Sequence, residues 1–288
     1  MDYTRQTAYS DPRSYAPLLT GLPSDPARLG AAIRNLVVHY RGAGIEFPDD
    51  RLAEIDNRWV DRIIACDQQR FPGSLLGPRP VEDRVVGCCR DFALLSVAAL
   101  RHHGIPARSR VGFADYFTPD FHVDHVITQW WDGAGWHAMD VEVDPSWALP
   151  VDGLDVPLRA GGLVPASQVW LAYRRGEIDV ETYGVATNLP SLRGAWFVRN
   201  YVFNEMAHRY GDELLLWDLF GLQSTELDGD LGLIDELAVL LSAADEGDDT
   251  ADRMLEDRYR TDPRLHPGRT VQSLSPRLSK AQEVTLAR

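Results

Sequence analysis

Lysine and cysteine are both scarce in this sequence. Lys280 is the only lysine among 29 basic residues, and three cysteines occur in 288 positions. A small, odd number of cysteines does not support a disulfide framework, and thiols outside disulfides suit a reducing compartment. We interpret the shortage of lysine as a property of a lysine-poor, arginine-rich proteome.

Positive charge and long apolar runs are lacking as well. The 29 basic residues stand against 43 acidic ones, so the formal net charge is −14. A surface of this sign disfavours nucleic acids and anionic membranes as partners. No uncharged apolar run is long enough to span a bilayer, and the first residues, MDYTRQTAYSDPRSY, contain no apolar signal region. We therefore expect a cytoplasmic protein that binds neither nucleic acid nor membrane.

The hydrophobic content of 44% is enough to bury a sizeable core. Apolar residues recur at helical spacing on both sides of a central region that is rich in β-branched and aromatic residues. We predict helices over 24–37 and 49–67 before this region, and over 167–175, 195–210 and 231–243 after it. By composition the chain divides into a helical N-terminal layer (1–80), a core (81–150), a helical cap (151–245) and a polar tail (246–288). We expect one compact domain, with the tail partly disordered or wrapped on the surface.

The stretch from Gly87 to Arg108, GCCRDFALLSVAALRHHGIPAR, predicts a helix that begins with two adjacent cysteines. Gly104 and Pro106 end this helix as a C-cap and a breaker. At a helix N-terminus the unpaired N–H groups and the helix dipole favour an anion, so they lower the pKa of a thiol there. The position therefore suits a nucleophilic thiolate.

A nucleophilic thiol needs a base, and the base needs a group that fixes its tautomer. A predicted strand over 107–113 and a loop over 115–120 lead to His125, which opens a strand ending at Trp131. After a turn at 132–135, a returning strand over 136–143 carries Asp140. In such a hairpin His125 and Asp140 can face each other across the ladder. His122 competes with His125 as the base, and Asp124 and Asp144 compete with Asp140.

Four pieces of this region carry a family resemblance. They are Gly87 to Phe92, Leu100 to Arg108, His125 to Trp131, and Gly135 to Asp140 with Trp136. Together they resemble the core of the transglutaminase-like cysteine superfamily, which has many bacterial members. The resemblance implies Cys89 as nucleophile, His125 as base and Asp140 as orienting acid. We accordingly predict an α+β fold with a transglutaminase-like or papain-like core. In it an antiparallel sheet packs on the cysteine helix, with helices from both ends of the chain at its flanks.

Other interpretations of these residues stay open. Cys88 is expected to be a buried structural residue, and a zinc site made by the two cysteines with His122 and His125 is the less favoured alternative, because the C-x-x-C spacing is missing. A donor upstream of the nucleophile can complete an oxyanion hole. Gln68, Gln69 and Arg84 are candidates for that donor.

The predicted function is cysteine-dependent acyl transfer through a thioester on Cys89, which forms, exchanges or cleaves an amide bond. A hydrolase acting on an amide or thioester, and a catalytically idle binding domain, are the alternatives. We expect a peptide, amide or thioester acyl donor and an amine acceptor, with no cofactor and no metal. The aromatic residues expected to line the substrate pocket are Trp130, Trp131 and Trp217.

Overall fold

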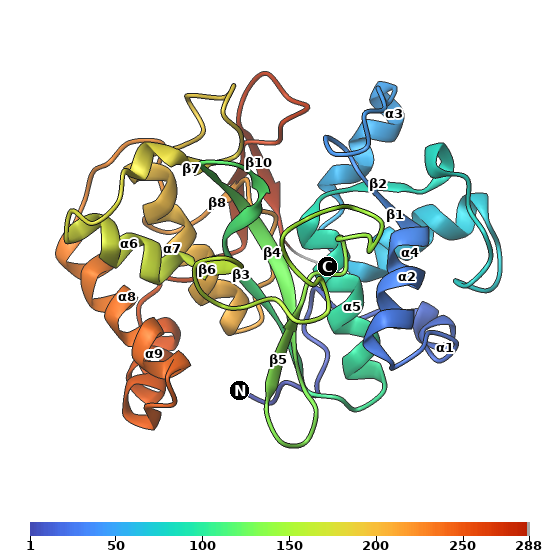
Figure 1. Ribbon diagram of the computed structural model, residues 1–288, viewed down its shortest axis with the longest axis horizontal. Helices are drawn as coiled ribbons and strands as arrows, with labels where there is room; N and C mark the ends of the chain where they lie inside the picture. The colour runs from blue at the N-terminus through green and yellow to red at the C-terminus, as the bar shows by residue number, and fades with distance from the viewer. Residues whose placement is uncertain (287–288) are drawn as a thin grey trace. The chain divides into compact units, whose positions relative to one another are not determined.

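The computed structural model describes residues 1–286 (Figure 1). The α-helices in this part of the chain are α1 (Ala16–Leu19), α2 (Pro26–Leu36), α3 (Asp49–Leu52), α4 (Val60–Arg70), α5 (Cys89–His102), α6 (Ala166–Arg174), α7 (Ala195–Arg209), α8 (Leu231–Asp245) and α9 (Asp249–Thr261). The strands are β1 (Val37–His39), β2 (Val85–Gly87), β3 (Ala107–Thr118), β4 (Phe121–Trp131), β5 (Trp136–Met139), β6 (Leu163–Pro165), β7 (Tyr183–Gly184), β8 (Asp218–Leu219), β9 (Thr270–Ser273) and β10 (Gln282–Thr285).

The strands form three sheets. The largest has the order β5-β4-β3-β6, with β7 pairing in parallel to the beginning of β4. β5 and β6 pair antiparallel to their neighbours β4 and β3. A second sheet joins β1 and β2 in parallel, and a third has the order β10-β9-β8. Helices and largely antiparallel sheets in one chain confirm the predicted α+β class.

The chain separates into two units that share strands β3 and β4. The first unit contains Met1–Ser109, Val126–Val156 and Glu213–Leu215, and the remaining described residues belong to the second. β3 therefore passes from the first unit into the second after Ser109, and β4 returns after His125. This division differs from the four consecutive segments predicted from composition, because strands and a short late segment return to the first unit.

Helix α5 is the centre of the first unit. Each of its residues from Cys89 to Arg101 is buried. The Ser96 hydroxyl forms a hydrogen bond with the hydroxyl of Thr128, so β4 lies against α5 within this unit. Helices α2 and α4 and the β1-β2 pair also pack on α5.

The two predicted N-terminal helices differ from the observed ones at their boundaries. Asp25 caps α2 by accepting a hydrogen bond from the N–H of Arg28, so the helix begins at Pro26 and not at residue 24. The pattern predicted as one helix over 49–67 is broken between residues 56 and 60. There the carbonyl groups of Asn57 and Arg58 accept hydrogen bonds from the buried Arg90 guanidinium, so they are not available to continue a helix.

The hairpin strands also differ from the prediction. β3 continues to Thr118, where a loop over 115–120 was predicted, and β4 begins at Phe121, four residues before His125. The tight turn between them uses Asp120 at φ +58°, a conformation that Asp tolerates better than most residues. β5 ends at Met139, so Asp140 follows the strand instead of lying on it.

In the second unit, α6, α7 and α8 pack together, as the helical periodicity predicted. The tail, predicted to be partly disordered or wrapped on the surface, contains a helix and two strands. Helix α9 buries Ala251, Leu255 and Tyr259, which are spaced four residues apart on one face. β9 and β10 then complete a sheet with β8. Residues 287 and 288 of the predicted tail lie outside the described residues.

Candidate active site

The candidate nucleophile lies at the first helical position of α5. Strand β2 ends at Gly87, Cys88 is the N-cap, and Cys89 begins the helix. The N–H of Cys88 donates to the Asp91 carboxylate at 2.9 Å, which is half of a capping box. A Cβ on Gly87 would lie 2.7 Å from the same carboxylate, so only glycine fits before the cysteines. This start of the helix is therefore fixed by local packing.

Arg90 anchors the same helical turn from inside the first unit. Its guanidinium is completely buried and forms an ion pair with Asp91 at 2.9 Å. It also donates to the carbonyl of Glu213, at 3.0 Å from Nε. The sequence analysis gave no role to Arg90 or Asp91. The Cys-x-x-Asp spacing, which resembles a capping box, could have indicated Asp91.

Cys88 and Cys89 are both buried, and Cys88 is buried as predicted. A hydrogen bond with the Cys89 side chain lowers the pKa of the Cys88 thiol, but burial and the neighbouring Asp91 carboxylate outweigh it and raise that pKa. Cys88 therefore stays protonated at neutral pH. No disulfide joins the cysteines, all three of which are among the described residues.

His125 lies within β4 and is 3% exposed. The rings of Phe117 and Tyr116, on the preceding strand, meet its imidazole at centroid distances of 5.0 and 6.2 Å in edge-on arrangements. The competing His122 is more exposed and already has a carboxylate partner. Its Nδ1 bonds to Asp115, and its ring stacks on Tyr183 at 4.0 Å.

Asp140 is 2% exposed and belongs to the first unit, as does Cys89. Its N–H donates to the carbonyl of Gly153 at 2.8 Å, and its Oδ1 accepts from the N–H of Glu142 at 3.0 Å. These two bonds make a tight turn directly after β5, which is why the strand ends there. The competing Asp124 accepts a hydrogen bond from the Tyr201 hydroxyl, and Asp144 is a half-exposed partner of Arg34.

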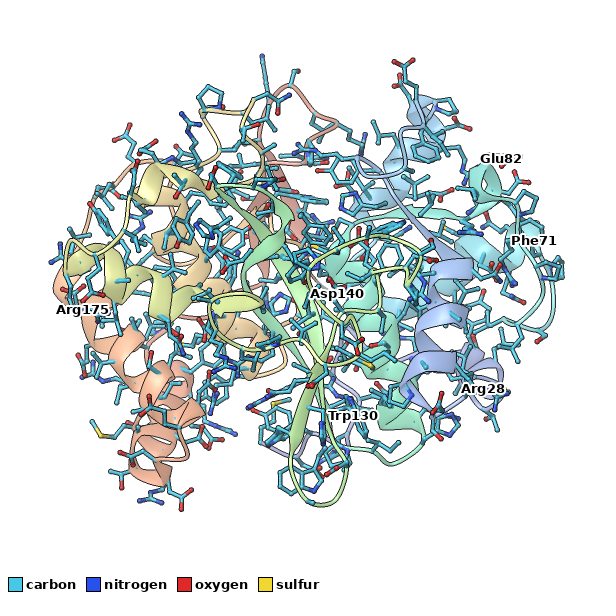
Figure 2. The ribbon with its side chains drawn as sticks, viewed as in Figure 1. Arg28, Phe71, Glu82, Trp130, Asp140 and Arg175 are labelled. Carbon is cyan, nitrogen blue, oxygen red and sulfur yellow. The ribbon has the colours of Figure 1, made fainter. Side chains whose placement is uncertain are left out.

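Within the first unit, two of the aromatic residues predicted to line a pocket, Trp130 and Trp131, lie away from Cys89. The N–H of Trp131 donates to the carbonyl of Pro106 at 2.9 Å, beyond the C-terminal end of α5. Because a 14-residue helix is about 20 Å long, this is far from Cys89 at the other end. Trp130 stacks on His137 at 5.2 Å, near the tip of the hairpin, whereas Asp140 lies at its other end (Figure 2). Trp217 belongs to the second unit, where its carbonyl accepts from the N–H of Leu274.

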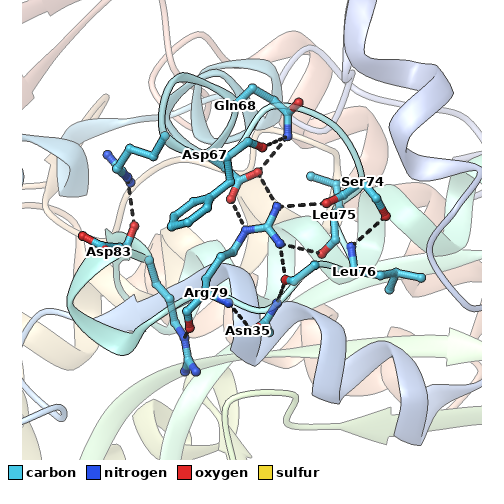
Figure 3. A network of polar contacts seen from close by, with 12 residues as sticks. Asn35, Asp67, Gln68, Ser74, Leu75, Leu76, Arg79 and Asp83 are labelled. Carbon is cyan, nitrogen blue, oxygen red and sulfur yellow. Dashed lines mark hydrogen bonds and ion pairs between the residues drawn. The ribbon is translucent and has the colours of Figure 1, made fainter.

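The loop before β2 is held by a buried ion pair between Asp67 and Arg79 (Figure 3). The Arg79 guanidinium also donates to the carbonyls of Ser74, Leu75 and Gly77. Gln68, a candidate oxyanion donor, bonds to Asp67 at 2.9 Å instead.

Arg84, another candidate, donates to the carbonyls of Arg34 and Arg79. Both of these candidate donors thus hold backbone or carboxylate groups of the first unit. Within residues 1–286, no three His, Cys, Asp or Glu side chains are grouped to hold a metal ion. In the same residues, every helix is too short or too polar to cross a membrane.

Residues 43–141 match the family model of the transglutaminase-like superfamily. This chain carries a transglutaminase-like domain. The matched segment includes Cys89, His125 and Asp140, so the predicted resemblance is confirmed over the region that carries them. The match supports a cysteine-dependent enzyme in general terms.

Two further comparisons complete this result. A solved structure from Cytophaga hutchinsonii, described as that of a candidate cysteine protease, is 20% identical to this chain, with a TM-score of 0.34. The alignment covers 53% of this chain and 44% of that chain, so it spans less than half of the neighbour's length. A search of curated proteins found no match to this sequence.

Proposed function

We propose that the transglutaminase-like domain catalyses acyl transfer through a thioester on Cys89, with His125 as the base and Asp140 as the orienting acid. The observation that carries the proposal is the placement of Cys89 as the first residue of α5, inside the segment that matches the family. Helix N–H groups at this point can stabilise both a thiolate and the oxyanion of a tetrahedral intermediate.

In the first half-reaction the Cys89 thiolate attacks the carbonyl carbon of an amide. The C–N bond breaks, and the protonated imidazole of His125 gives its proton to the leaving amine. The role we propose for Asp140 is to accept the Nδ1–H of His125 and so fix its tautomer. The product of this half-reaction is a thioester on Cys89.

In the second half-reaction an incoming amine or water attacks the thioester, and His125 takes its proton. The C–S bond breaks, and the thiolate is restored. We propose an amine as the favoured acceptor, because the rings of Tyr116 and Phe117 beside His125 make its surroundings apolar and limit the access of water. A peptide or another amide, or a thioester, is the proposed acyl donor.

Mass spectrometry of the intact protein tests the nucleophile. After incubation with a glutamine-containing peptide, a peptide amide or a peptide thioester, we expect an acyl adduct that maps to Cys89. Cys89→Ala should lose the adduct and turnover, whereas Cys88→Ala should keep both. An adduct on Cys88 would contradict the choice of Cys89 as the nucleophile. Alkylation of Cys66 by iodoacetamide at the same rate as Cys89 would contradict a special reactivity of Cys89. No adduct with any donor would favour a binding domain without turnover.

The acceptor is tested by trapping the acyl-enzyme and measuring its decay with a series of primary amines. A transferase predicts release rates that rise with amine concentration and an amide product for each amine. Rates that do not depend on amine concentration for any member of the series would show a hydrolase.

A further inference from the structure

Arg34, in the last turn of α2, contacts the turn that carries Asp140. Its Nη1 donates to the carbonyl of Val141 at 2.9 Å and to the carbonyl of Val143 at 3.0 Å. Its Nε lies 3.5 Å from a carboxylate oxygen of Asp144. One guanidinium thus holds three of the four residues that follow Asp140, and all of these residues belong to the first unit.

Gly153 closes the turn through other contacts. Its carbonyl accepts the N–H of Asp140 at 2.8 Å. A Cβ on Gly153 would lie 3.1 Å from the Asp140 carbonyl and 3.0 Å from the Val143 side chain. The Asp140 turn is therefore fixed both by Arg34 and by the backbone of Gly153, which lies close against it.

The charge of Arg34 also acts on Asp140. Burial lowers the pKa of the Arg34 guanidinium, while the carboxylates of Asp144 and Asp140 act in the opposite direction. The interaction is mutual, so the guanidinium favours the ionised form of Asp140. A carboxylate as buried as this one needs a nearby positive charge or hydrogen-bond donors to stay ionised.

Gly30, one helical turn before Arg34, leaves room for this contact. A Cβ at Gly30 would lie 3.2 Å from Nη1 of Arg34 and 3.8 Å from the Val141 side chain. Since Nη1 is held by two carbonyls at 2.9 and 3.0 Å, moving away by the few tenths of an ångström that a Cβ requires would lengthen these hydrogen bonds. Glycine in the middle of a helix costs up to about 1 kcal/mol relative to alanine, so this residue is unfavourable for the helix alone.

We infer that Arg34 is a positioning residue for the reaction: it holds the Asp140 turn in place and supplies the positive charge beside the orienting carboxylate. This inference rests on the proposed function, because it gives Arg34 a role through Asp140 and His125. The charged groups around the turn are Arg34 from α2, Arg84 through its action on Asp144, and Glu142 and Asp144 of the turn itself.

The test compares Arg34→Gln, Arg34→Lys and Gly30→Ala with Arg28→Gln, which removes an exposed charge from the same helix (Figure 2). Turnover of an amide donor is measured as kcat, KM and the pH dependence of kcat/KM. For Arg34→Gln we expect kcat to fall roughly 10- to 100-fold with little change in KM. Losses of this size are typical when a residue that orients a functional side chain, without touching the substrate, is removed. The acid limb of the pH profile should move to higher pH, because Asp140 becomes easier to protonate.

Arg34→Lys should restore part of kcat, since it keeps the charge but not the forked geometry. Gly30→Ala should lower kcat without lowering the melting temperature, and Arg28→Gln should behave as the wild type. Wild-type kcat and pH profile in both Arg34→Gln and Gly30→Ala would overturn the inference. If Arg34→Gln does not fold, unchanged kcat in Gly30→Ala and Arg34→Lys would overturn it instead. Turnover that survives Cys89→Ala would instead refute the proposed function.

Discussion

At the scale of single residues, the start of α5 depends on the absence of a side chain at Gly87. A Cβ there would lie 2.7 Å from Oδ2 of Asp91 and 3.0 Å from the Val37 side chain. The carboxylate would have to leave the N–H of Cys88, which it caps at 2.9 Å. The backbone that presents Cys89 would then lose its cap.

We therefore expect Gly87→Ala to destabilise the protein by about 0.5–2 kcal/mol, the usual cost of a lost helix cap, with added strain from the contact with Val37. Alkylation of Cys89 by iodoacetamide should slow as well. Urea denaturation and a labelling time course measure the two effects. Gly135→Ala is the control, because a Cβ at Gly135 meets no atom within 4 Å. Equal behaviour of the two variants would contradict the role given to Gly87.

Also at this scale, the position of Cys89 at the helix start could be predicted from the sequence, because the beginning of an apolar helical run is a local pattern. Arg34 could not be predicted in the same way. Its carbonyl partner on Val141 is 107 positions away, and only the folded chain brings the two together. The role of the buried Arg90 could not be predicted for a similar reason, since its partner Glu213 is 123 positions away.

At the scale of elements, the loop between α4 and β2 is held by one buried ion pair. The side chains of Arg79 and Asp67 are 1% and 4% exposed. Removing one partner of such a pair leaves the other charge buried and without compensation. Without Asp67, the Arg79 guanidinium would lose the partner that positions it, and its hydrogen bonds to the loop carbonyls would weaken.

Asp67→Ala should destabilise the first unit by about 3–5 kcal/mol, as measured by chemical denaturation. Limited proteolysis should cut the loop between residues 71 and 80 faster than in the wild type. Glu177→Gln, which breaks an exposed pair with Arg175, should have no measurable effect (Figure 2). A loss for Asp67→Ala no larger than for Glu177→Gln would argue against the structural importance of the pair.

Element types were more predictable than element ends. Helices α6, α7 and α8 follow from apolar residues at helical spacing, which is a property of each segment by itself. The end of β5 depends instead on the bond from Asp140 to Gly153, and the extension of β3 is accompanied by a bond from Asp115 to Gly162. These partners come from other parts of the chain, so local periodicity does not contain them.

At the scale of the whole molecule, the second unit contains a buried acid with an unusual pKa. Glu205 on α7 accepts hydrogen bonds from the N–H and hydroxyl of Ser167, at 2.7 and 3.1 Å, and lies 3.7 Å from Arg110. Burial raises the pKa of Glu205 from 4.5 to about 7, although Arg110 acts in the opposite direction. The folded state therefore binds a proton between these pH values that the unfolded state has released.

The free energy of unfolding should consequently fall as pH rises from 4.5 through about 7. Outside this window the contribution of Glu205 to that free energy should not change with pH. Glu205→Gln keeps an acceptor for Ser167 but cannot titrate. Denaturation at pH 4.5, 6 and 8 should show the wild type losing stability relative to this variant across the window. A constant difference between the two proteins would mean that Glu205 does not titrate there.

The short segment Glu213–Leu215, which belongs to the first unit, has a consequence for synthesis of the chain on the ribosome. Arg90 and Arg101 on α5 both need Glu213, as a carbonyl for one and a carboxylate at 2.9 Å for the other. Translation at about 5–20 residues per second delivers Glu213 roughly 6–25 s after Arg90. During that interval the two guanidinium groups of the nascent helix lack their bonds to Glu213. The first unit can thus reach its native packing only after about half of the second unit has been made.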